Sequence, residues 1–526
     1  MVVSAQADAT QAGVEVLKSG GNAVDAAVAV GFALAVTHPR AGNLGGGGFM
    51  LIRFADGRKT FLDFRERAPA AAHRDMYLGP DGEPTEEMIV GYRASGVPGT
   101  ARGLEMAADK YGTKPVKELL EPAVRLARDG FVVTFDQSGS LQSDRMAKFP
   151  ESRRIFQRDG KYYEMGEVFR QPDLHKTLER MVKHGVDDFY AGETARLIAA
   201  DMKKNGGTIT LDDLKGYKPT ERTPLSGKYR GYEIITAPPP SSGGVGIIQM
   251  LSMLEDSGYE RSGAGSAAAI HYVAETMRRY FADRAAYFGD PDFVSVPVDL
   301  LTRKRYARER AATIDRGRAG NSVGMPPGLP TGAESTETTH YSVVDSEGNA
   351  VSVTYTLNGS FGSGVTAVGT GVLLNNEMDD FSSKPGAPNN AGLLTSEKNA
   401  IKPGKRPLSS MTPTIVARDG KLYMVVGSPG GPTIISTVLQ VIINSIDFEM
   451  DLQQAVDFPR FHHQWMPDEL RLERHGHSQD TVERLRQRGH EIKFVGKQGR
   501  VMAIQRTDEW LLGAADGRSE GLAAGF

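Results

Sequence analysis

The spacing of apolar and polar residues predicts a chain of buried helices and β-hairpins. Residues 23–37 are apolar on nearly every side, which predicts a buried helix that ends before His38-Pro39. Ahead of it, residues 2–4 are expected to form a strand, and Asp8 is expected to cap a helix that ends near residue 17. The first part of the chain therefore contributes both helix and sheet.

A run of four glycines, residues 45–48, precedes an apolar strand over residues 49–52. Because glycine has no Cβ, such a run indicates backbone packed closely against a neighbour. Helical periodicity then dominates residues 100–220, for example over 115–130 and 173–184. It is expected to give way to one strand over residues 228–237.

The second half of the sequence predicts hairpins beside long helices. The segment 315–337 is rich in Gly and Pro and has little apolar periodicity, which predicts a long loop. The elements expected around it are a helix over 265–287, a hairpin with strands at 338–345 and 350–357, a second hairpin with strands at 413–417 and 422–427, and a helix over 433–446.

Composition excludes several kinds of site. Of 526 residues, 40% are apolar and the net charge is −3, which does not fit a broad nucleic-acid-binding surface. The chain has no cysteine, so disulfides, thiol catalysis and cysteine-bound metals are excluded. The longest apolar stretch, residues 26–36, is too short to span a bilayer. The chain starts without a signal peptide, which fits either a removed targeting segment or an authentic cytoplasmic start.

A candidate nucleophile stands where the long loop meets the first hairpin. A threonine hydroxyl reacts poorly without a base, but an N-terminal threonine carries one in its own α-amine, whose pKa is about 7.7–8.0. Cleavage between Glu337 and Thr338 would expose that amine. An ordinary strand can also begin with threonine, because β-branched residues suit a sheet. This pattern alone leaves both interpretations open.

Long motifs stand in a fixed order along the whole chain. They are Asp63-Phe64-Arg65-Glu66, the stretch from Glu337 to Asp345, Thr354-Tyr355-Thr356-Leu357-Asn358, Asn375-Asn376-Glu377-Met378-Asp379-Asp380, Arg406-Pro407-Leu408-Ser409-Ser410 and Gly427-Ser428-Pro429-Gly430-Gly431. Together they resemble the motifs of the γ-glutamyltransferase (glutathione hydrolase) family of bacterial type, and the stretch from Glu337 to Asp345 resembles the processing site of that family. They are long and specific, and they keep the order of the family.

The resemblance implies a role for each matched residue. Thr338 would be the nucleophile of both self-cleavage and catalysis, and Thr356 would hydrogen-bond to it. Arg65 would bind the α-carboxylate of the glutamyl group, a task that suits a bidentate guanidinium. The backbone N–H groups of Gly430 and Gly431 would stabilise the oxyanion.

Further matched residues would hold the head group of the substrate. Asn358, Glu377 and Asp380 would bind the α-amine, and Ser409 and Ser410 would support the α-carboxylate. Each of these residues also fits a plain structural role, such as a turn or an ion pair. The γ-glutamyl-enzyme formed from glutathione or a related compound would pass its acyl group to water, an amino acid or a peptide. Neither a cofactor nor a metal is required for this acyl transfer.

The family resemblance also implies the fold, an α+β four-layer αββα sandwich of the N-terminal-nucleophile hydrolase type. Residues 1–337 would become the large subunit and residues 338–526 the small catalytic subunit. Both would come from one precursor and remain together, because their strands would share one core. A periplasmic or secreted location is implied, with a cytoplasmic one as the alternative, and neither nucleic acid nor a membrane span is expected.

One departure from the family concerns its lid. Residues 385–404 match the lid loop of bacterial members, but Ala391 stands where such lids commonly carry an aromatic residue. A looser lid would alter the balance between hydrolysis and transfer. Three alternative functions remain at this stage: a cephalosporin (glutaryl) acylase of the same family, a poly-γ-glutamate hydrolase, and an uncleaved binding pseudoenzyme.

Two other patterns imitate functional motifs. Residues 320–324, Gly-Asn-Ser-Val-Gly, fit the G-x-S-x-G nucleophile pattern, but no apolar strand leads into them. His462-His463 and His475-Gly476-His477 have no clear set of partners at the spacing of metal ligands. We expect structural roles for both.

Overall fold

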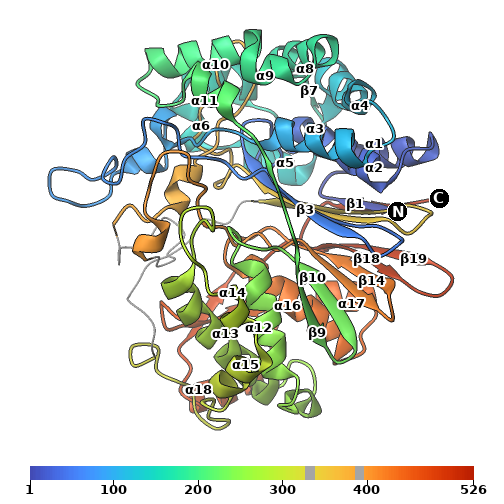
Figure 1. Ribbon diagram of the computed structural model, residues 1–526, viewed down its shortest axis with the longest axis vertical. Coiled ribbons are helices and arrows are strands. Elements are labelled where there is room, and N and C mark those ends of the chain that lie inside the picture. The colour runs from blue at the N-terminus through green and yellow to red at the C-terminus, as the bar shows by residue number, and fades with distance from the viewer. Residues whose placement is uncertain (326–337, 385–395) are drawn as a thin grey trace.

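Two stacked β-sheets lie between two layers of helices (Figure 1). The computed structural model describes residues 1–325, 338–384 and 396–526. The chain ends lie side by side at one edge of the first sheet, where β1 (Val2–Ser4) pairs with β20 (Leu522–Ala524). This arrangement confirms the predicted αββα sandwich.

The first sheet carries the strand that follows the candidate nucleophile. Its neighbouring strands are all antiparallel. Within the described residues its order is β20, β1, β11 (Thr339–Val344), β12 (Ala350–Thr356), β2 (Gly47–Arg53), β3 (Lys59–Asp63) and β8 (Thr220–Arg222). The strands β11 and β12 are the predicted hairpin, and every residue in both is buried.

The second sheet packs face to face on the first. In the described part of the chain its order is β19 (Leu511–Ala515), β18 (Met502–Arg506), β14 (Lys421–Val426), β13 (Thr414–Arg418), β10 (Tyr232–Thr236) and β9 (Leu225–Tyr229). A hydrogen bond of 3.4 Å from Ser352 Oγ on β12 to the carbonyl of Val426 on β14 joins the two sheets. A smaller sheet is formed by β15 (Phe461–His462), β16 (Leu470–Glu473) and β17 (Ile492–Val495).

Helices from the first part of the chain cover the outer face of the first sheet (Figure 1). They are α1 (Ala7–Lys18), α2 (Ala23–Thr37), α3 (Thr100–Tyr111), α4 (Val116–Asp129), α5 (Phe135–Leu141), α6 (Asp144–Ala147), α7 (Pro150–Phe156), α8 (Pro172–His184), α9 (Asp187–Ala191), α10 (Glu193–Lys204) and α11 (Leu211–Gly216). The second sheet is covered by α12 (Gly243–Leu254), α13 (Ala267–Tyr287), α14 (Val298–Leu301), α15 (Lys304–Ala311), α16 (Thr433–Ile446), α17 (Leu452–Asp457) and α18 (Gln479–Gln487).

Helix α2 shows why the sequence pattern was informative. All of its residues are buried, as the all-round apolar pattern predicted. Asn22 and Asp25 form a capping box at its start, so its first backbone N–H groups are paired. It packs on the hairpin, where the Tyr355 hydroxyl donates to the carbonyl of Gly31 at 2.9 Å.

Strands from before and after Thr338 pair with each other in both sheets. In the first sheet, β11 and β12 lie between β1 and β2, and in the second sheet β13 pairs with β10. A break before Thr338 would therefore leave each segment hydrogen-bonded to strands of the other. This shared core is the physical reason to expect that the two subunits stay together after cleavage.

Two predicted elements were wrong in detail. Helix α1 begins at Ala7 after an N-cap at Gln6, so Asp8 lies in the first turn and does not cap the helix. There it still favours the helix, because the N-terminal end of the helix dipole is positive. The expected single strand over residues 228–237 is instead the hairpin β9–β10. Arg230 and Gly231 both have positive φ, 46° and 86°, which produces its two-residue turn.

Candidate active site

The start of strand β11 brings two threonine hydroxyls together. Thr338 lies directly before β11 and is buried, and its Oγ1 donates to Thr356 Oγ1 at 3.3 Å. Thr356 ends β12, opposite Thr338 when the pairing of Thr339 with Tyr355 is extended by one residue. The Thr356 hydroxyl also accepts the amide N–H of Asn358 at 2.8 Å. The predicted contact between the two threonines is present.

The glycine run at the start of β2 packs against the end of β12 on the side away from β11. A Cβ on Gly46 would lie 2.0 Å from the carbonyl oxygen of Thr356, and one on Gly48 would lie 2.5 Å from that of Thr354. Asn43 donates from Nδ2 to the Thr356 carbonyl at 2.9 Å and accepts the Gly46 amide at 2.7 Å. The prediction of backbone packed closely against these glycines is confirmed. Its effect is to fix the threonine pair.

Polar side chains continue along the face of β11 that contains Thr338. The His340 ring bonds to Thr354 Oγ1 at 2.8 Å and to Ser342 Oγ at 3.2 Å. Burial lowers the pKa of His340 to about 3, so the ring is neutral. A Cβ on Gly427 would lie 2.3 Å from that ring. The ring therefore sets how closely the segment after β14 approaches β11.

The turn that contains the predicted oxyanion glycines follows directly from this contact. Val426 lies beside Ser352, and the next residue, Gly427, lies beside His340. The chain after β14 therefore runs along β11 in the direction of Thr338. Gly430 and Gly431 have φ of 131° and 55°, a region that favours glycine. Their carbonyls accept the first amides of α16, at 3.1 Å each.

Replacing Gly430 by alanine should lower kcat by roughly 10²-fold or more, the usual effect of losing an oxyanion donor. The added Cβ would lie 2.5 Å from Thr433 Oγ1 at a φ that alanine rarely adopts, so the turn must shift. The control is Gly420→Ala in the β13–β14 turn, where φ is 75° and the Cβ would meet open space. Equal losses of kcat in the two variants would contradict a catalytic role for the turn that contains Gly430.

Arg65 follows β3 and is surrounded by acceptors. Its guanidinium bonds to the carboxylates of Glu377 and Asp380. It also donates from Nε to the carbonyl of Pro407 at 3.3 Å and from Nη2 to that of Leu408 at 3.1 Å. The side chain is buried, so this geometry is rigid. The sequence-predicted Arg65, Glu377 and Asp380 therefore form one group.

The two acidic residues come from the 3-10 helix η4 (Glu377–Asp380). Asn375 orients this turn, because its Oδ1 accepts the Glu377 amide at 2.9 Å while its Nδ2 donates to the carbonyls of Gly45 and Gly96. Asn358 reaches the same turn, donating from Nδ2 to the carbonyl of Asn376 at 3.0 Å. A chain of contacts thus links the threonine pair to the Arg65 group.

Ser409 and Ser410 lie beside this group, but their hydroxyls bond elsewhere. Ser409 Oγ accepts the amide of Met411 at 3.1 Å. Ser410 Oγ accepts from Nη2 of Arg284 at 3.1 Å. From this segment, the backbone carbonyls of Pro407 and Leu408 contact Arg65. The assignment of these serines to a substrate carboxylate stays a prediction.

Sequence reasoning gave no role to two residues that shape the site. Asn375 and Glu66 both stood inside matched motifs, and Glu66 is fully buried next to Arg65. For Glu66, the sequence did offer a signal, because this acidic residue directly follows the arginine that was predicted to bind a carboxylate. Two predicted positions, Glu337 at the cleavage site and Ala391 in the lid, lie outside the described residues.

The two imitating patterns have structural partners. Ser322 is buried, and its amide donates to Asp468 Oδ2 at 2.9 Å while its carbonyl accepts from Trp465 Nε1 at 2.9 Å. His462 bonds to Ser436 Oγ at 2.8 Å and to Gln464 Oε1 at 3.0 Å. Nε2 of His463 lies 3.3 Å from Asp468 Oδ1, and burial lowers the pKa of this ring. Nε2 of His477 lies 3.5 Å from the carbonyl of Arg460.

A group with suitable donors for a metal lies elsewhere, at His271, Glu275 and His490. The two rings already bond to each other at 2.7 Å. The Glu275 carboxylate accepts from Arg278 at 3.0 Å and from Arg279 at 2.7 Å. Two guanidinium groups on the carboxylate oppose a further cation, so the group fits a buried ion-pair network.

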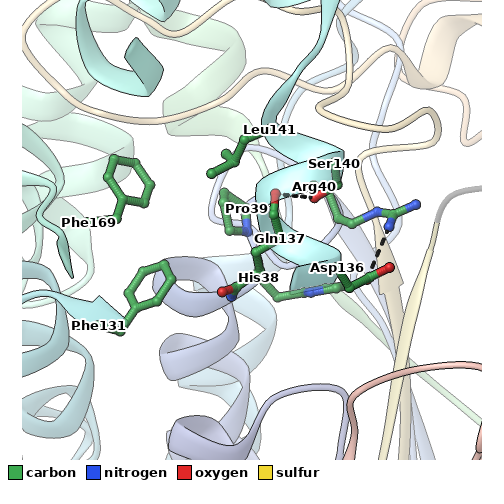
Figure 2. A pocket seen from close by; sticks show the side chains of 9 residues that line it. All are labelled: His38, Pro39, Arg40, Phe131, Asp136, Gln137, Ser140, Leu141 and Phe169. Carbon is green, nitrogen blue, oxygen red and sulfur yellow. Dashed lines mark hydrogen bonds and ion pairs between the residues drawn. The ribbon is translucent and has the colours of Figure 1, made fainter. Parts of the chain in front are cut away.

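A small cavity beside the end of α2 is separate from the threonine pair (Figure 2). Its volume of about 10 Å³ is enough for no more than about one water molecule. It is lined by His38, Pro39, Arg40, Phe131, Asp136, Gln137, Ser140, Leu141 and Phe169, and Arg40 pairs with Asp136 across its rim at 3.6 Å. The cavity is too small for a substrate.

Two stacked sheets between helical layers, with a buried threonine directly before a central strand, have the architecture of the N-terminal-nucleophile hydrolases. A family model described as gamma-glutamyltranspeptidase matches residues 9–526, and the chain belongs to that family. It is 51% identical to the glutathione hydrolase proenzyme of Escherichia coli (strain K12), over 100% of this chain and 92% of that protein.

Two solved structures are also similar. Cephalosporin acylase from Bacillus halodurans superposes with a TM-score of 0.87 at 29% identity, covering 100% of this chain and 95% of that chain. A chain of gamma-glutamyltranspeptidase from Helicobacter pylori superposes with a TM-score of 0.61 at 45% identity. It covers 61% of this chain and 94% of that chain.

Proposed function

We propose that the protein is a self-processing γ-glutamyltransferase and glutathione hydrolase whose nucleophile is Thr338. The observation that carries this is the buried contact between Thr338 and Thr356, joined through Asn358 to the Arg65 group. It combines a reactive hydroxyl with a site for a group that bears both a carboxylate and an ammonium.

Processing would begin with attack of the Thr338 hydroxyl on the carbonyl carbon of Glu337. The peptide C–N bond breaks as the new ester forms, and the nitrogen of Thr338 becomes a free amine. Water then hydrolyses the ester, giving residues 1–337 a carboxyl end and residues 338–526 an N-terminal threonine. The solved chain from Helicobacter pylori covers a share of this chain close to that of residues 1–337.

Catalysis would use the amine that processing releases. The amine takes the hydroxyl proton, and Thr338 Oγ1 attacks the γ-carbonyl of the donor. The amides of Gly430 and Gly431 would stabilise the tetrahedral oxyanion. The protonated amine then gives its proton to the leaving amine. Water or an amino acid attacks the γ-glutamyl ester in the second half of the reaction, which regenerates the hydroxyl.

Donor binding would exchange partners within the Arg65 group. The α-carboxylate of the donor would take an edge of the guanidinium that Glu377 and Asp380 now occupy. Its α-ammonium would then lie against those two carboxylates and the Asn358 side chain. Such an exchange keeps every buried charge paired. Ser409 and Ser410 would support the bound carboxylate only after a change in the partners of their hydroxyls.

The alternative of a cephalosporin acylase is suggested by the similar fold of the Bacillus halodurans enzyme. A glutaryl group has no α-ammonium. The excess of carboxylates around Arg65 favours an acyl group that carries one, because a buried carboxylate without a cation is costly. Comparison of kcat/KM for γ-glutamyl and glutaryl anilides separates the two functions, and we expect the γ-glutamyl donor to be preferred.

The purified protein should separate into two chains on a denaturing gel. In proportion to their lengths within 56.8 kDa, the expected bands lie at about 36 and about 20 kDa. The same sample should elute as one species from a sizing column, because the strands of the two chains interleave. A lasting full-length band without γ-glutamyl anilide turnover would support the uncleaved binding protein instead.

Location and acceptor belong to the same proposal. Among the described residues no helix is both long and apolar enough to cross a membrane. Resemblance to the family favours a periplasmic or secreted enzyme that acts on glutathione and passes the γ-glutamyl group to water, amino acids or small peptides. Activity assayed in separated cell fractions tests the location.

A further inference from the structure

One guanidinium stands among three carboxylates in the Arg65 group. Arg65 Nη1 lies 3.5 Å from Glu66 Oε2, and the same guanidinium contacts Glu377 and Asp380 directly. Arg65, Glu66 and Glu377 are all buried, with exposed fractions of 1% or less. Three ionised carboxylates would leave two negative charges uncompensated in a medium that solvates charge poorly.

Glu66 and Glu377 meet at one atom of Arg65. Glu377 Oε1 contacts Nη1 directly, and Glu66 Oε2 lies 3.5 Å from the same nitrogen. Within the described residues, both oxygens of Glu66 and Oε2 of Glu377 have no hydrogen-bond donor. Two ionised carboxylates held on one nitrogen repel each other, whereas a proton on one of them removes a negative charge and supplies a donor to the other. The geometry therefore favours one proton on the pair.

Backbone closes the site around Glu66. A Cβ on Gly47 would lie 2.8 Å from Glu66 Oε2, and one on Gly96 would lie 3.1 Å from Glu66 Cβ. Both neighbours are glycines with no side chain to donate, and they leave little room for water. Arg65 is thus the cation that stabilises a negative charge on Glu66 within the described residues.

Other charged groups nearby are already engaged. Arg406 donates to the carbonyl of Arg65 at 3.1 Å and pairs with Asp63 at 3.2 Å. The Tyr217 hydroxyl donates to the same carbonyl at 2.9 Å. The titratable groups around the Glu66–Glu377 pair are Arg65, Asp380, Asp63, Arg67, Arg406 and Tyr217.

We propose that Glu66 and Glu377 share one proton at neutral pH, and that Glu66 is a positioning residue which holds Glu377 for the α-ammonium of the donor. The proton gives the pair one negative charge, so that the pair and Asp380 together offer two charges to Arg65 and one ammonium. The part played in donor binding rests on the proposed function, whereas the sharing of the proton does not.

The titration of the two groups agrees with this arrangement. Burial raises the pKa of Glu66 to about 7, and burial also raises the pKa of Glu377 well above its usual range. Two carboxyl groups that interact this strongly lose their protons as a pair, in separate steps. Above neutral pH the pair loses its proton and gains a second negative charge.

The lost proton has a direct consequence for donor binding. The added charge lies on the pair, whose two carboxylates both face Arg65 Nη1, and there it competes with the α-carboxylate of the donor for the guanidinium. The KM of the donor should therefore rise as the pH passes through the pKa of the pair. Glutamine at position 66 keeps an N–H donor for Glu377 and cannot ionise, so Glu66→Gln should lack this part of the pH dependence.

The first test is infrared difference spectroscopy of the processed enzyme at about pH 6.5, where exposed carboxyl groups are ionised. We expect the carbonyl stretch of a protonated carboxylic acid in the wild type and its loss in both Glu66→Gln and Glu377→Gln. Loss in both variants identifies one shared proton. A band that survives in each variant, or is absent from the wild type, overturns the proposal whether or not the enzyme turns over γ-glutamyl donors.

The second test is the KM of a γ-glutamyl anilide between about pH 6 and pH 8.5 for the wild type and Glu66→Gln. The donor amine and the Thr338 amine titrate in both enzymes, so the ratio of the two KM values isolates the pair. We expect the KM of the wild type, divided by that of Glu66→Gln, to rise about fivefold or more above neutral pH. A ratio that stays constant with pH would contradict the role of Glu66 in donor binding. It would not contradict the proposed γ-glutamyl transfer, which the rate of donor turnover measures separately.

Discussion

Thr338→Ala should leave the chain at full length and lower γ-glutamyl anilide turnover by about 10⁴-fold or more. Alanine has no oxygen to attack the carbonyl of Glu337, so neither the ester nor the free amine can form. The hydroxyl that contacts Thr356 at 3.3 Å is lost at the same time. Denaturing gels over several days and initial rates with the same preparation measure the two effects.

The next residue supplies the matched control. Thr339 is buried like Thr338, but its Oγ1 has no hydrogen-bond partner among the residues that the structure describes. Thr339→Val should therefore be cleaved and active. Thr338→Ser, which keeps a hydroxyl and an amine, should be cleaved more slowly and retain part of the activity. Cleavage and normal turnover in Thr338→Ala would show that another residue is the nucleophile.

Arg65→Ala should have the second-largest effect, on both donor binding and stability. It leaves buried carboxylates without their cation, which typically costs about 3–5 kcal/mol in the free energy of unfolding. Loss of a buried partner for the α-carboxylate of the donor should raise KM by a factor equivalent to about 2–5 kcal/mol. Urea unfolding and steady-state kinetics measure the two quantities separately.

Arg65→Lys separates charge from geometry. A lysine keeps one positive charge, but a single ammonium cannot replace the contacts from Nε, Nη1 and Nη2 that Arg65 makes to two carboxylates and two carbonyls. We expect stability to recover more than KM does. The control is Arg58→Lys, an exposed ion pair with Asp56 that contributes little. An unchanged KM in Arg65→Lys would contradict a bidentate carboxylate site.

Long, regular patterns made much of the fold predictable. Helix α16 spans Thr433–Ile446 as expected, and β11 and β12 lie within one residue of the predicted hairpin. The strand expected over residues 228–237 was wrong because an arginine with positive φ, at Arg230, is not distinguishable in sequence from one within a strand. The turn depends on the conformation that the neighbouring strand imposes.

The site was predictable where spacing along the sequence determines spacing in the fold. The family resemblance implied the contact between Thr338 and Thr356, and the hairpin that was predicted from sequence explains it, because it brings the two residues opposite each other. The directions of the serine hydroxyls could not be predicted from sequence. Ser410, for example, accepts a hydrogen bond from Arg284, which lies on a helix far away in the sequence. The environment of Glu66 was equally hidden, because it depends on glycines at positions 47 and 96 and on η4 far along the chain.

Trapping of the acyl-enzyme tests the central claim most directly. The purified enzyme is mixed with a γ-glutamyl donor, quenched in acid and digested, and its peptides are sequenced by mass spectrometry. We predict a γ-glutamyl group on the side chain of Thr338, in a peptide whose N-terminus is Thr338 itself. A γ-glutamyl group on any other residue, or Thr338 found only within an uncut peptide of an active sample, would contradict the account.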